Sequence, residues 1–163
     1  MFVFLTKTKM KYKPDGHHSN RMQFEGDTSR ARSHYFNRAT SNLKLLLFNR
    51  FNWMNSFINE NSKGIEVGAG TGLSKVSKEF IKCNNFFITD YAENPWLDSK
   101  MVDALNTKID SNSLDFVISS NMIHHVPYPT LFFEEMNRIL KPGGKLIIQE
   151  INCSNSMRFL LKL

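Results

Sequence analysis

Short apolar segments alternate with longer amphipathic segments along most of this chain. Runs rich in apolar and β-branched residues predict buried strands at 65–67, 86–90, 114–120 and 145–151, with a very short further strand at 100–102. Apolar residues between these runs recur every three or four positions, which is the spacing of amphipathic helices. The alternation of strands with helices predicts an α/β fold with a parallel sheet covered on both faces.

The segment from 29 to 58 predicts two helices ahead of the first strand. Thr40 or Ser41 can cap the second of these helices. Apolar residues of the second helix share one face, which we interpret as a packing surface. They are Leu43, Leu46, Leu47, Phe51, Met54 and Ile58. Helices in this place could fold over the turn after the first strand and close a ligand pocket.

Three more helices are predicted within and after the strands. One follows the glycine turn, with Leu73, Val76, Phe80 and Ile81 on one face. Another covers 130–140 and is stopped by Pro142-Gly143-Gly144, and the segment 157–163 predicts the opening of a third.

The first 28 residues show no sustained periodicity apart from a short strand predicted at 2–5, so we expect a mostly irregular leader. We therefore divide the chain into a leader with a helical lid at 1–60 and an α/β core at 61–163.

Composition and charge narrow the class of protein. The chain has 163 residues, 41% of them hydrophobic and 22% charged, which is typical of one soluble globular domain. Its net charge of +6 arises largely from basic residues spread over the first 50 positions, and no RNA-binding, zinc or helix-turn-helix motif accompanies them. We therefore expect no nucleic-acid partner. Cys83 and Cys153 are far apart, and no signal peptide or membrane span is found, so we expect a reducing, cytoplasmic location and no membrane partner.

The segment Gly64 to Gly72 reads Gly-Ile-Glu-Val-Gly-Ala-Gly-Thr-Gly and joins the first strand to the next predicted helix. Glycines at 68, 70 and 72 allow the backbone to turn through positive φ and allow a ligand to lie directly on it. The N–H groups of the helix start would face that ligand. The alternative is a tight turn between strand and helix that binds nothing.

Acidic and hydroxyl side chains occur where other strands end. Asp90 ends the second strand, Asp103 follows the third, and Ser119 lies in the fourth. The carboxyl ends of parallel strands share one edge of a sheet, which is where ligands bind in open α/β folds. Asp90 is thus placed to accept hydrogen bonds from the ribose hydroxyls of a nucleoside. Its alternative role is that of a loop or cap carboxylate.

With these residues assembled, the chain resembles the class I S-adenosylmethionine-dependent methyltransferases, in particular the broad small-molecule group called type 11. The resemblance covers about residues 64–151. The matching segments are Glu66-Val-Gly68-Ala-Gly70-Thr-Gly72, Asp90, Asp103-Ala104, Ser119 to His125, and Arg138-Ile-Leu-Lys-Pro-Gly-Gly144.

The resemblance implies a Rossmann-like, doubly wound sheet with strand order 3-2-1-4-5, and S-adenosylmethionine as the cofactor. It also implies that the glycine loop and the residues at the ends of the later strands bind this cofactor, to which we add Tyr91, beside Asp90. The predicted cofactor-binding residues are Glu66, Gly68, Gly70, Gly72, Asp90, Tyr91, Asp103, Ala104 and Ser119. No metal site is expected, and the catalytic base is left unassigned, although His124 and His125 are candidates for proton transfer.

One departure from the family is the absence of its last two strands, because the sequence stops at Leu163. Three explanations stay open: a fragment of a longer protein, a sheet edge that pairs with another copy of the chain, or a degenerate relative.

The predicted function is methyl transfer to a small-molecule acceptor, such as a sugar or another metabolite. One alternative is a non-catalytic module that binds a nucleoside or a protein partner. Another is a nicotinamide-dependent oxidoreductase, which is disfavoured because Gly70-Thr71-Gly72 lacks the Gly-x-x-Gly spacing that admits a pyrophosphate.

Overall fold

The computed structural model describes residues 27–77 and 80–150. Residues 1–26 of the predicted leader, with its strand at 2–5, and the predicted helix at 157–163 lie outside the described residues.

A four-stranded parallel sheet forms the centre of the protein, with the strand order β2-β1-β3-β4. The strands are β1 (Lys63–Val67), β2 (Asn85–Ile88), β3 (Leu114–Ser120) and β4 (Leu140–Gln149). This order confirms the Rossmann-like α/β fold. Read across the sheet, β2, β1, β3 and β4 are the second, first, fourth and fifth predicted strands. Their order is the predicted one.

The third strand predicted at Lys100 to Val102 is wrong. The segment runs beside the end of β2 but forms only an isolated parallel bridge, between Thr89 and Ser99. Met101 then takes a positive φ of 54°, which turns the backbone out of the extended conformation. The segment therefore follows the sheet edge without joining the sheet as a strand.

Helices α2 (Thr28–Arg38) and α3 (Ser41–Asn52) precede the sheet, followed by the 3-10 helix η2 (Trp53–Phe57). The two helices are those predicted from the sequence. Thr40 caps α3, since its hydroxyl accepts a hydrogen bond from the backbone N–H of Leu43 at 3.3 Å.

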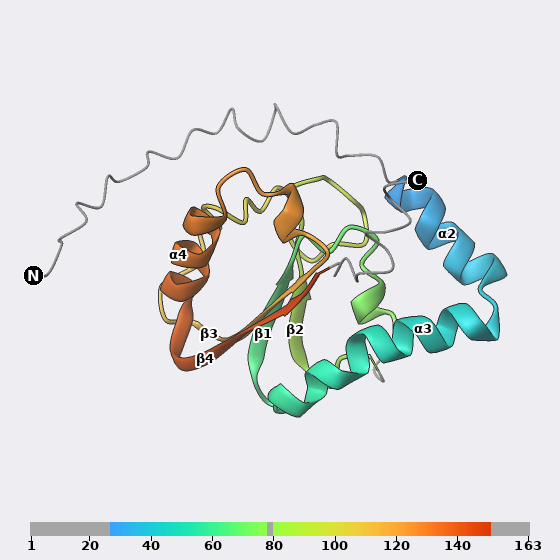
Figure 1. Cartoon of the computed structure of the whole chain (residues 1–163), viewed down its shortest axis with the longest axis horizontal. Coiled ribbons are helices and arrows are strands. Elements are labelled where there is room, and N and C mark those ends of the chain that lie inside the picture. The colour runs from blue at the N-terminus through green and yellow to red at the C-terminus, as the bar shows by residue number, and fades with distance from the viewer. Residues whose placement is uncertain (1–26, 78–79, 151–163) are drawn as a thin grey trace, which may run out of the picture.

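Only the carboxyl-terminal end of α3 packs against the sheet. Phe51 is buried at that end, as is Met54 in η2, whereas Leu46 is 66% exposed, so the predicted apolar face is wrong at Leu46. The amino-terminal end of α3 extends past the sheet, and α2 folds back from its far end toward the strands (Figure 1).

Helix α4 (Pro129–Ile139) confirms the helix predicted at 130–140, but the strand after it starts earlier than predicted. Strand β4 begins at Leu140, which pairs with Leu114 of β3. The Pro142–Gly144 segment is therefore inside β4, where an irregular register accommodates it, instead of separating helix from strand.

The long helix predicted at 73–81 is also wrong. The described residues of this segment hold only the 3-10 helix η3 (Leu73–Lys75). At its far end, the side chain of Asn55 donates to the carbonyl of Phe80 at 2.8 Å and accepts from the N–H of Lys82 at 2.8 Å. These bonds satisfy backbone groups at the end of the segment, where the chain is not helical.

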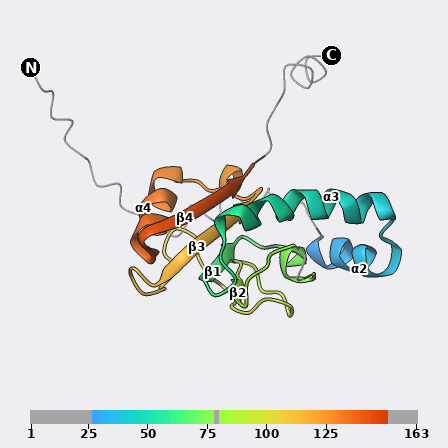
Figure 2. The ribbon, with the colours of Figure 1, turned by 90° about the horizontal axis from the view of Figure 1, so that it is seen from below.

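Two apolar clusters fill the space on the two faces of the sheet. Helix α4 packs on one face, with Phe132, Met136 and Ile139 buried against β1 and β3. Helix α3 and η2 pack on the other face. Figure 2 shows α3 and α4 apart, with the strands between them. This three-layer arrangement leaves the carboxyl ends of the strands as the edge where the predicted site residues meet.

Candidate functional site

The loop after β1 has the backbone that the glycines were predicted to provide. Gly68, Gly70 and Gly72 have φ angles of 68°, 50° and 63°, all in the left-handed region. Side chains with a Cβ are strained in that region, so the alternating glycines allow this turn.

Neighbouring side chains approach the three glycines very differently. A Cβ added at Gly68 would lie 2.2 Å from Cγ of Met122, and one at Gly72 would lie 2.7 Å from Cδ1 of Trp96. A Cβ at Gly70 would meet only a methyl carbon of Thr28, at 3.7 Å. The backbone is therefore closely covered at both ends of the loop and less crowded at Gly70.

Asp90 lies beside this open position, as the sequence predicts for the end of the second strand. Its Oδ2 accepts a hydrogen bond from the N–H of Gly70 at 2.7 Å, and its Oδ1 accepts one from the N–H of Ala92 at 2.8 Å. A carboxylate oxygen can accept more than one hydrogen bond, so both oxygens retain capacity for a ligand hydroxyl.

The Asp103-Ala104 pair approaches the same edge through the segment before it. The N–H of Val102 donates to the carbonyl of Asp90 at 2.9 Å. Oδ1 of Asp103 accepts from the N–H of Leu105 at 2.8 Å, and burial raises the pKa of Asp103. Ala104 is buried. Tyr91 follows Asp90 directly and is half-buried.

Ser119 lies deeper than the other predicted residues. It pairs with Val67, the last residue of β1, and its side chain is fully buried. Its hydroxyl has no hydrogen-bond partner among the residues that the structure describes. Ser119 therefore lies beneath the glycine loop, whereas Asp90 lies beside it.

Glu66 is 3% exposed and points toward the α3 face of the sheet. The hydroxyl of Ser74 donates a hydrogen bond to its Oε2. Burial, with a smaller contribution from the Asp90 carboxylate, raises the pKa of Glu66 to about 7, against the opposing effects of Ser74 and Arg50. Glu66 therefore ties the end of β1 to the residues that follow Gly72.

Arg50 is a polar residue of this site that the sequence analysis missed. It reaches from α3 to the end of β3, where its Nε and Nη2 donate to the hydroxyl of Ser120 at 3.2 and 2.9 Å. A signal was present, because Arg50 lies three positions after Leu47 and four before Met54, inside the apolar stripe of the helix.

Arg32 and Trp96 were missed as well. Nη1 of Arg32 donates to the carbonyl of Thr71 at 2.7 Å, and the guanidinium lies 4.9 Å from the centre of the Trp96 ring. The indole N–H of Trp96 donates to the carbonyl of Gly70 at 2.9 Å. These contacts fasten α2 to the glycine loop. No local sequence signal indicates them, since the groups come from distant segments of the chain.

His124 contacts the carboxyl group of Glu150, the residue that follows β4. Nδ1 of His124 lies 2.7 Å from Oε2 of Glu150, whose Oε1 accepts from the N–H groups of Met122 and Ile123 at 2.9 and 2.6 Å. Burial raises the pKa of Glu150, but these hydrogen bonds outweigh it and lower the pKa overall. Burial and the neighbouring His124 lower the pKa of His125.

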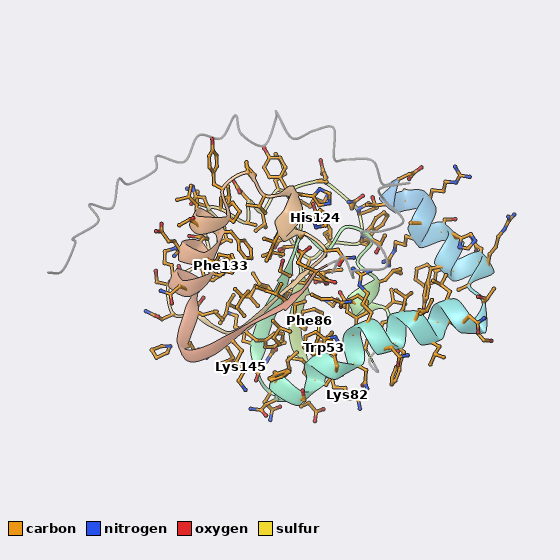
Figure 3. The ribbon with its side chains drawn as sticks, in the orientation of Figure 1. Trp53, Lys82, Phe86, His124, Phe133 and Lys145 are labelled. Atoms are coloured by element: carbon orange, nitrogen blue, oxygen red, sulfur yellow. The ribbon has the colours of Figure 1, made fainter. Side chains whose placement is uncertain are left out.

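Figure 3 shows His124 at one end of the sheet and both Lys82 and Lys145 at the other. A cavity of about 510 Å³ lies at that other end. It is lined by Glu60, Lys75, Ser77, Ile81, Lys82, Cys83, Asn84 and Phe86. None of the predicted site residues lines this cavity.

No group of three or more metal-binding side chains is found among residues 27–77 and 80–150. None of the helices in the same ranges combines the length and the apolar content needed to span a membrane.

Known proteins share both the sequence pattern and the fold. A family model described as a methyltransferase domain matches residues 65–148. The chain is similar to phosphoethanolamine N-methyltransferase 2 of Caenorhabditis elegans, with 32% identity over 96 residues, 52% of this chain and 22% of that protein. It is also similar to the highly reducing polyketide synthase PKS6 of Gibberella zeae, with 29% identity over 119 residues, 57% of this chain and 5% of that protein. The chain thus spans less than a quarter of the length of either relative.

The solved structure of an S-adenosylmethionine-dependent methyltransferase from Aquifex aeolicus has the same fold. The TM-score is 0.56 at 18% identity, with 80% of this chain and 76% of the other covered. At this identity the likeness concerns the fold alone.

Proposed function

The chain belongs to the type 11 family of methyltransferase domains, which use S-adenosylmethionine, and on this premise we propose that it transfers the cofactor's methyl group to a small-molecule acceptor. The observation that carries the proposal is the contact between Asp90 and the N–H of Gly70 at 2.7 Å. It brings a carboxylate that suits ribose hydroxyls next to the least crowded position of the glycine loop.

The residues at this edge fit the cofactor. Asp90 retains acceptor capacity for the ribose, and the space that a Cβ at Gly70 would take is less crowded than that at Gly68 or Gly72. Asp103 and Ala104 stand next along the edge, where the family resemblance puts the adenine. When bound, the cofactor supplies an electrophilic methyl group on a sulfonium ion.

The contribution of the protein would be mainly positional. Arg32 and Trp96 hold α2 over the glycine loop, and this helix can shield the reacting groups from water. Aligning acceptor and methyl group in such a site accounts for much of the acceleration available to a transfer of this kind.

Acceptors that carry a proton need a base. The Nδ1 of His124 is committed to Glu150, so its other ring nitrogen is the group available to accept a proton. This arrangement supports His124 as the first candidate, while a quaternising transfer to an already unprotonated nitrogen would need no base.

Two observations favour a small molecule as acceptor. The relative from Caenorhabditis elegans is called a phosphoethanolamine N-methyltransferase, which is a protein named for a small phosphorylated amine. The basic residues of this chain are spread out and lack a nucleic-acid-binding motif, which does not favour a nucleic-acid acceptor.

The test is a methyl-transfer assay with isotopically labelled S-adenosylmethionine and a panel of phosphoethanolamine, simple amines, hydroxy acids and sugars. We expect labelled product with at least one member, reduced about tenfold or more by Asp90→Ala. Asp110→Ala, which removes an exposed carboxylate elsewhere, is the matched control and should leave the rate unchanged. Transfer to RNA or protein alone, or equal effects of the two substitutions, would contradict the proposal.

A further inference from the structure

Arg50 stands directly beside the glycine loop, although it belongs to α3. Ser119 pairs with Val67 at the end of β1, so Ser120, one residue further, lies level with Gly68. The Arg50 guanidinium is bound to the Ser120 hydroxyl through Nε and Nη2. Its positive charge is therefore held at the carboxyl edge of the sheet, next to the first glycine of the loop.

The hydrogen-bonding capacity of this guanidinium is only partly used. A guanidinium carries five N–H donors in a planar fork. Within residues 27–77 and 80–150, the side-chain hydrogen bonds of Arg50 all go to one neutral hydroxyl, and its Nη1 makes none. The fork thus keeps donors that can bind a further acceptor.

The two nearest carboxyl groups are committed elsewhere. Glu66 and Glu150 both act electrostatically on Arg50, but neither forms an ion pair with it. Glu66 accepts from Ser74, and its raised pKa of about 7 leaves it partly protonated near neutral pH. Glu150 is bound by His124 and by two backbone N–H groups. Neither neutralises the guanidinium by direct contact.

A half-buried cation without a direct counter-ion is costly. Burial lowers the pKa of Arg50, and the two carboxyl groups only partly oppose this effect. Folded proteins usually compensate such a charge by pairing it. An anionic ligand group at this position would supply the missing partner.

We propose that Arg50 binds the anionic group, a carboxylate or a phosphate, of a ligand held at the glycine loop. This inference rests on the proposed function, which offers two sources of that chemistry. S-adenosylmethionine carries a carboxylate at its amino-acid end, and a phosphorylated acceptor carries a phosphate. The planar fork of arginine matches both groups and can bind two oxygens at once.

Calorimetric titration of the full chain separates the two sources. The first two ligands are S-adenosylhomocysteine and 5′-methylthioadenosine, which keeps the nucleoside but lacks the carboxylate. The third is phosphoethanolamine, added to the chain saturated with S-adenosylhomocysteine. The variants are Arg50→Gln and Arg50→Lys, with Arg38→Gln as the matched control because Arg38 is exposed at the end of α2. Thermal unfolding of each variant verifies that it folds.

If the cofactor supplies the carboxylate, Arg50→Gln weakens S-adenosylhomocysteine about 10- to 100-fold and leaves 5′-methylthioadenosine unchanged. If the acceptor supplies the phosphate, the same variant leaves both nucleosides unchanged and weakens phosphoethanolamine by a similar factor. In either case Arg50→Lys, which keeps the charge without the fork, should recover some of the affinity.

Two results would overturn the assignment in distinguishable ways. If the unsubstituted chain binds the ligands and Arg50→Gln binds all of them with unchanged affinity, Arg50 is not the anion site and the proposed function stands. If the unsubstituted, folded chain binds none of the three ligands, both the proposed function and the assignment of Arg50 fail. Should Arg50→Gln not fold, Arg50→Lys decides by the same comparison of the three ligands.

Discussion

The hydroxyl of Ser74 donates a hydrogen bond to the carboxyl group of Glu66, and both residues are buried next to the glycine loop. This contact fixes the end of β1 to the backbone that follows Gly72. Because Glu66 is shielded from water, its charged form is disfavoured, and its pKa rises from 4.5 to about 7.

The raised pKa of Glu66 predicts a specific pH dependence of stability. Below pH 4.5 the carboxyl group is protonated in both the folded and the unfolded chain. Between pH 4.5 and 7 the unfolded chain releases this proton first, so the folded state loses up to about 3 kcal/mol of stability as the pH rises.

Glu66→Gln, which cannot ionise, should abolish that loss. Urea unfolding between pH 5 and pH 8 measures the free energy of unfolding of both chains. As the pH rises, the variant should become increasingly more stable relative to the unsubstituted chain. A difference that stays constant with pH would show that Glu66 titrates normally in the folded state.

Gly72→Ala should be strongly destabilising. Its φ of 63° strains any residue with a Cβ, and the new methyl group would lie 2.7 Å from Cδ1 of Trp96 and 2.8 Å from Cδ1 of Ile88. Strain and overpacking together should cost about 2–4 kcal/mol in the free energy of unfolding.

Gly143→Ala is the matched control for Gly72→Ala. Gly143 also has a positive φ, of 80°, but a Cβ there meets no atom within 4 Å. It should therefore cost only the backbone strain, about 1 kcal/mol. Equal losses for the two substitutions in urea unfolding would mean that Trp96 and Ile88 do not pack against Gly72 as described.

Arg32→Ala should loosen α2 from the glycine loop. None of the residues of α2 is buried, and Arg32 supplies both the bond to the carbonyl of Thr71 and the stacking on Trp96. Hydrogen exchange of the α2 amides, measured by mass spectrometry, should accelerate about fivefold or more while α3 stays protected. Arg30→Ala removes an exposed arginine of the same helix and should have no such effect. Unchanged exchange in Arg32→Ala would contradict the role of this residue.

Glu150→Ala should destabilise the turn after β3. It leaves the N–H groups of Met122 and Ile123 without their acceptor, which should cost about 1–3 kcal/mol. Glu134→Ala, on the exposed face of α4, should change the free energy of unfolding by less than about 0.5 kcal/mol. The prediction fails if denaturation shows the two variants to be alike.

The spacing of apolar residues was enough to locate those strands and helices whose burial is visible in their own sequence. The apolar runs at β1, β2 and β3 and the amphipathic pattern of α4 were located correctly because each carries its burial in its own side chains. The positive φ angles at Gly68, Gly70 and Gly72 likewise follow from residue type.

The strands and helices that were predicted wrongly depend on contacts with residues far away in the chain. Strand β4 starts at Leu140 because β3 offers a pairing position there, which no local pattern records. The segment after the glycine loop is not helical at Phe80, where Asn55, from a distant part of the chain, binds the backbone. Met101 leaves the extended conformation although its neighbours read as a strand.

The residues of the candidate site also fall into those that the sequence predicts and those that only the structure reveals. Asp90 was identifiable because it ends a strand, and the structure puts it against Gly70 as expected. The contacts of Arg32 with Trp96 and of Arg50 with Ser120 join helices to distant loops, so they emerge only from the fold.

Calorimetric titration with S-adenosylhomocysteine and with NAD, for the unsubstituted chain and Asp90→Ala, tests the central claim most directly. If the glycine loop and Asp90 hold the cofactor of a methyltransferase, S-adenosylhomocysteine binds, NAD does not, and Asp90→Ala weakens the binding about tenfold or more. Failure of the folded chain to bind S-adenosylhomocysteine, or equal binding by Asp90→Ala, would contradict it.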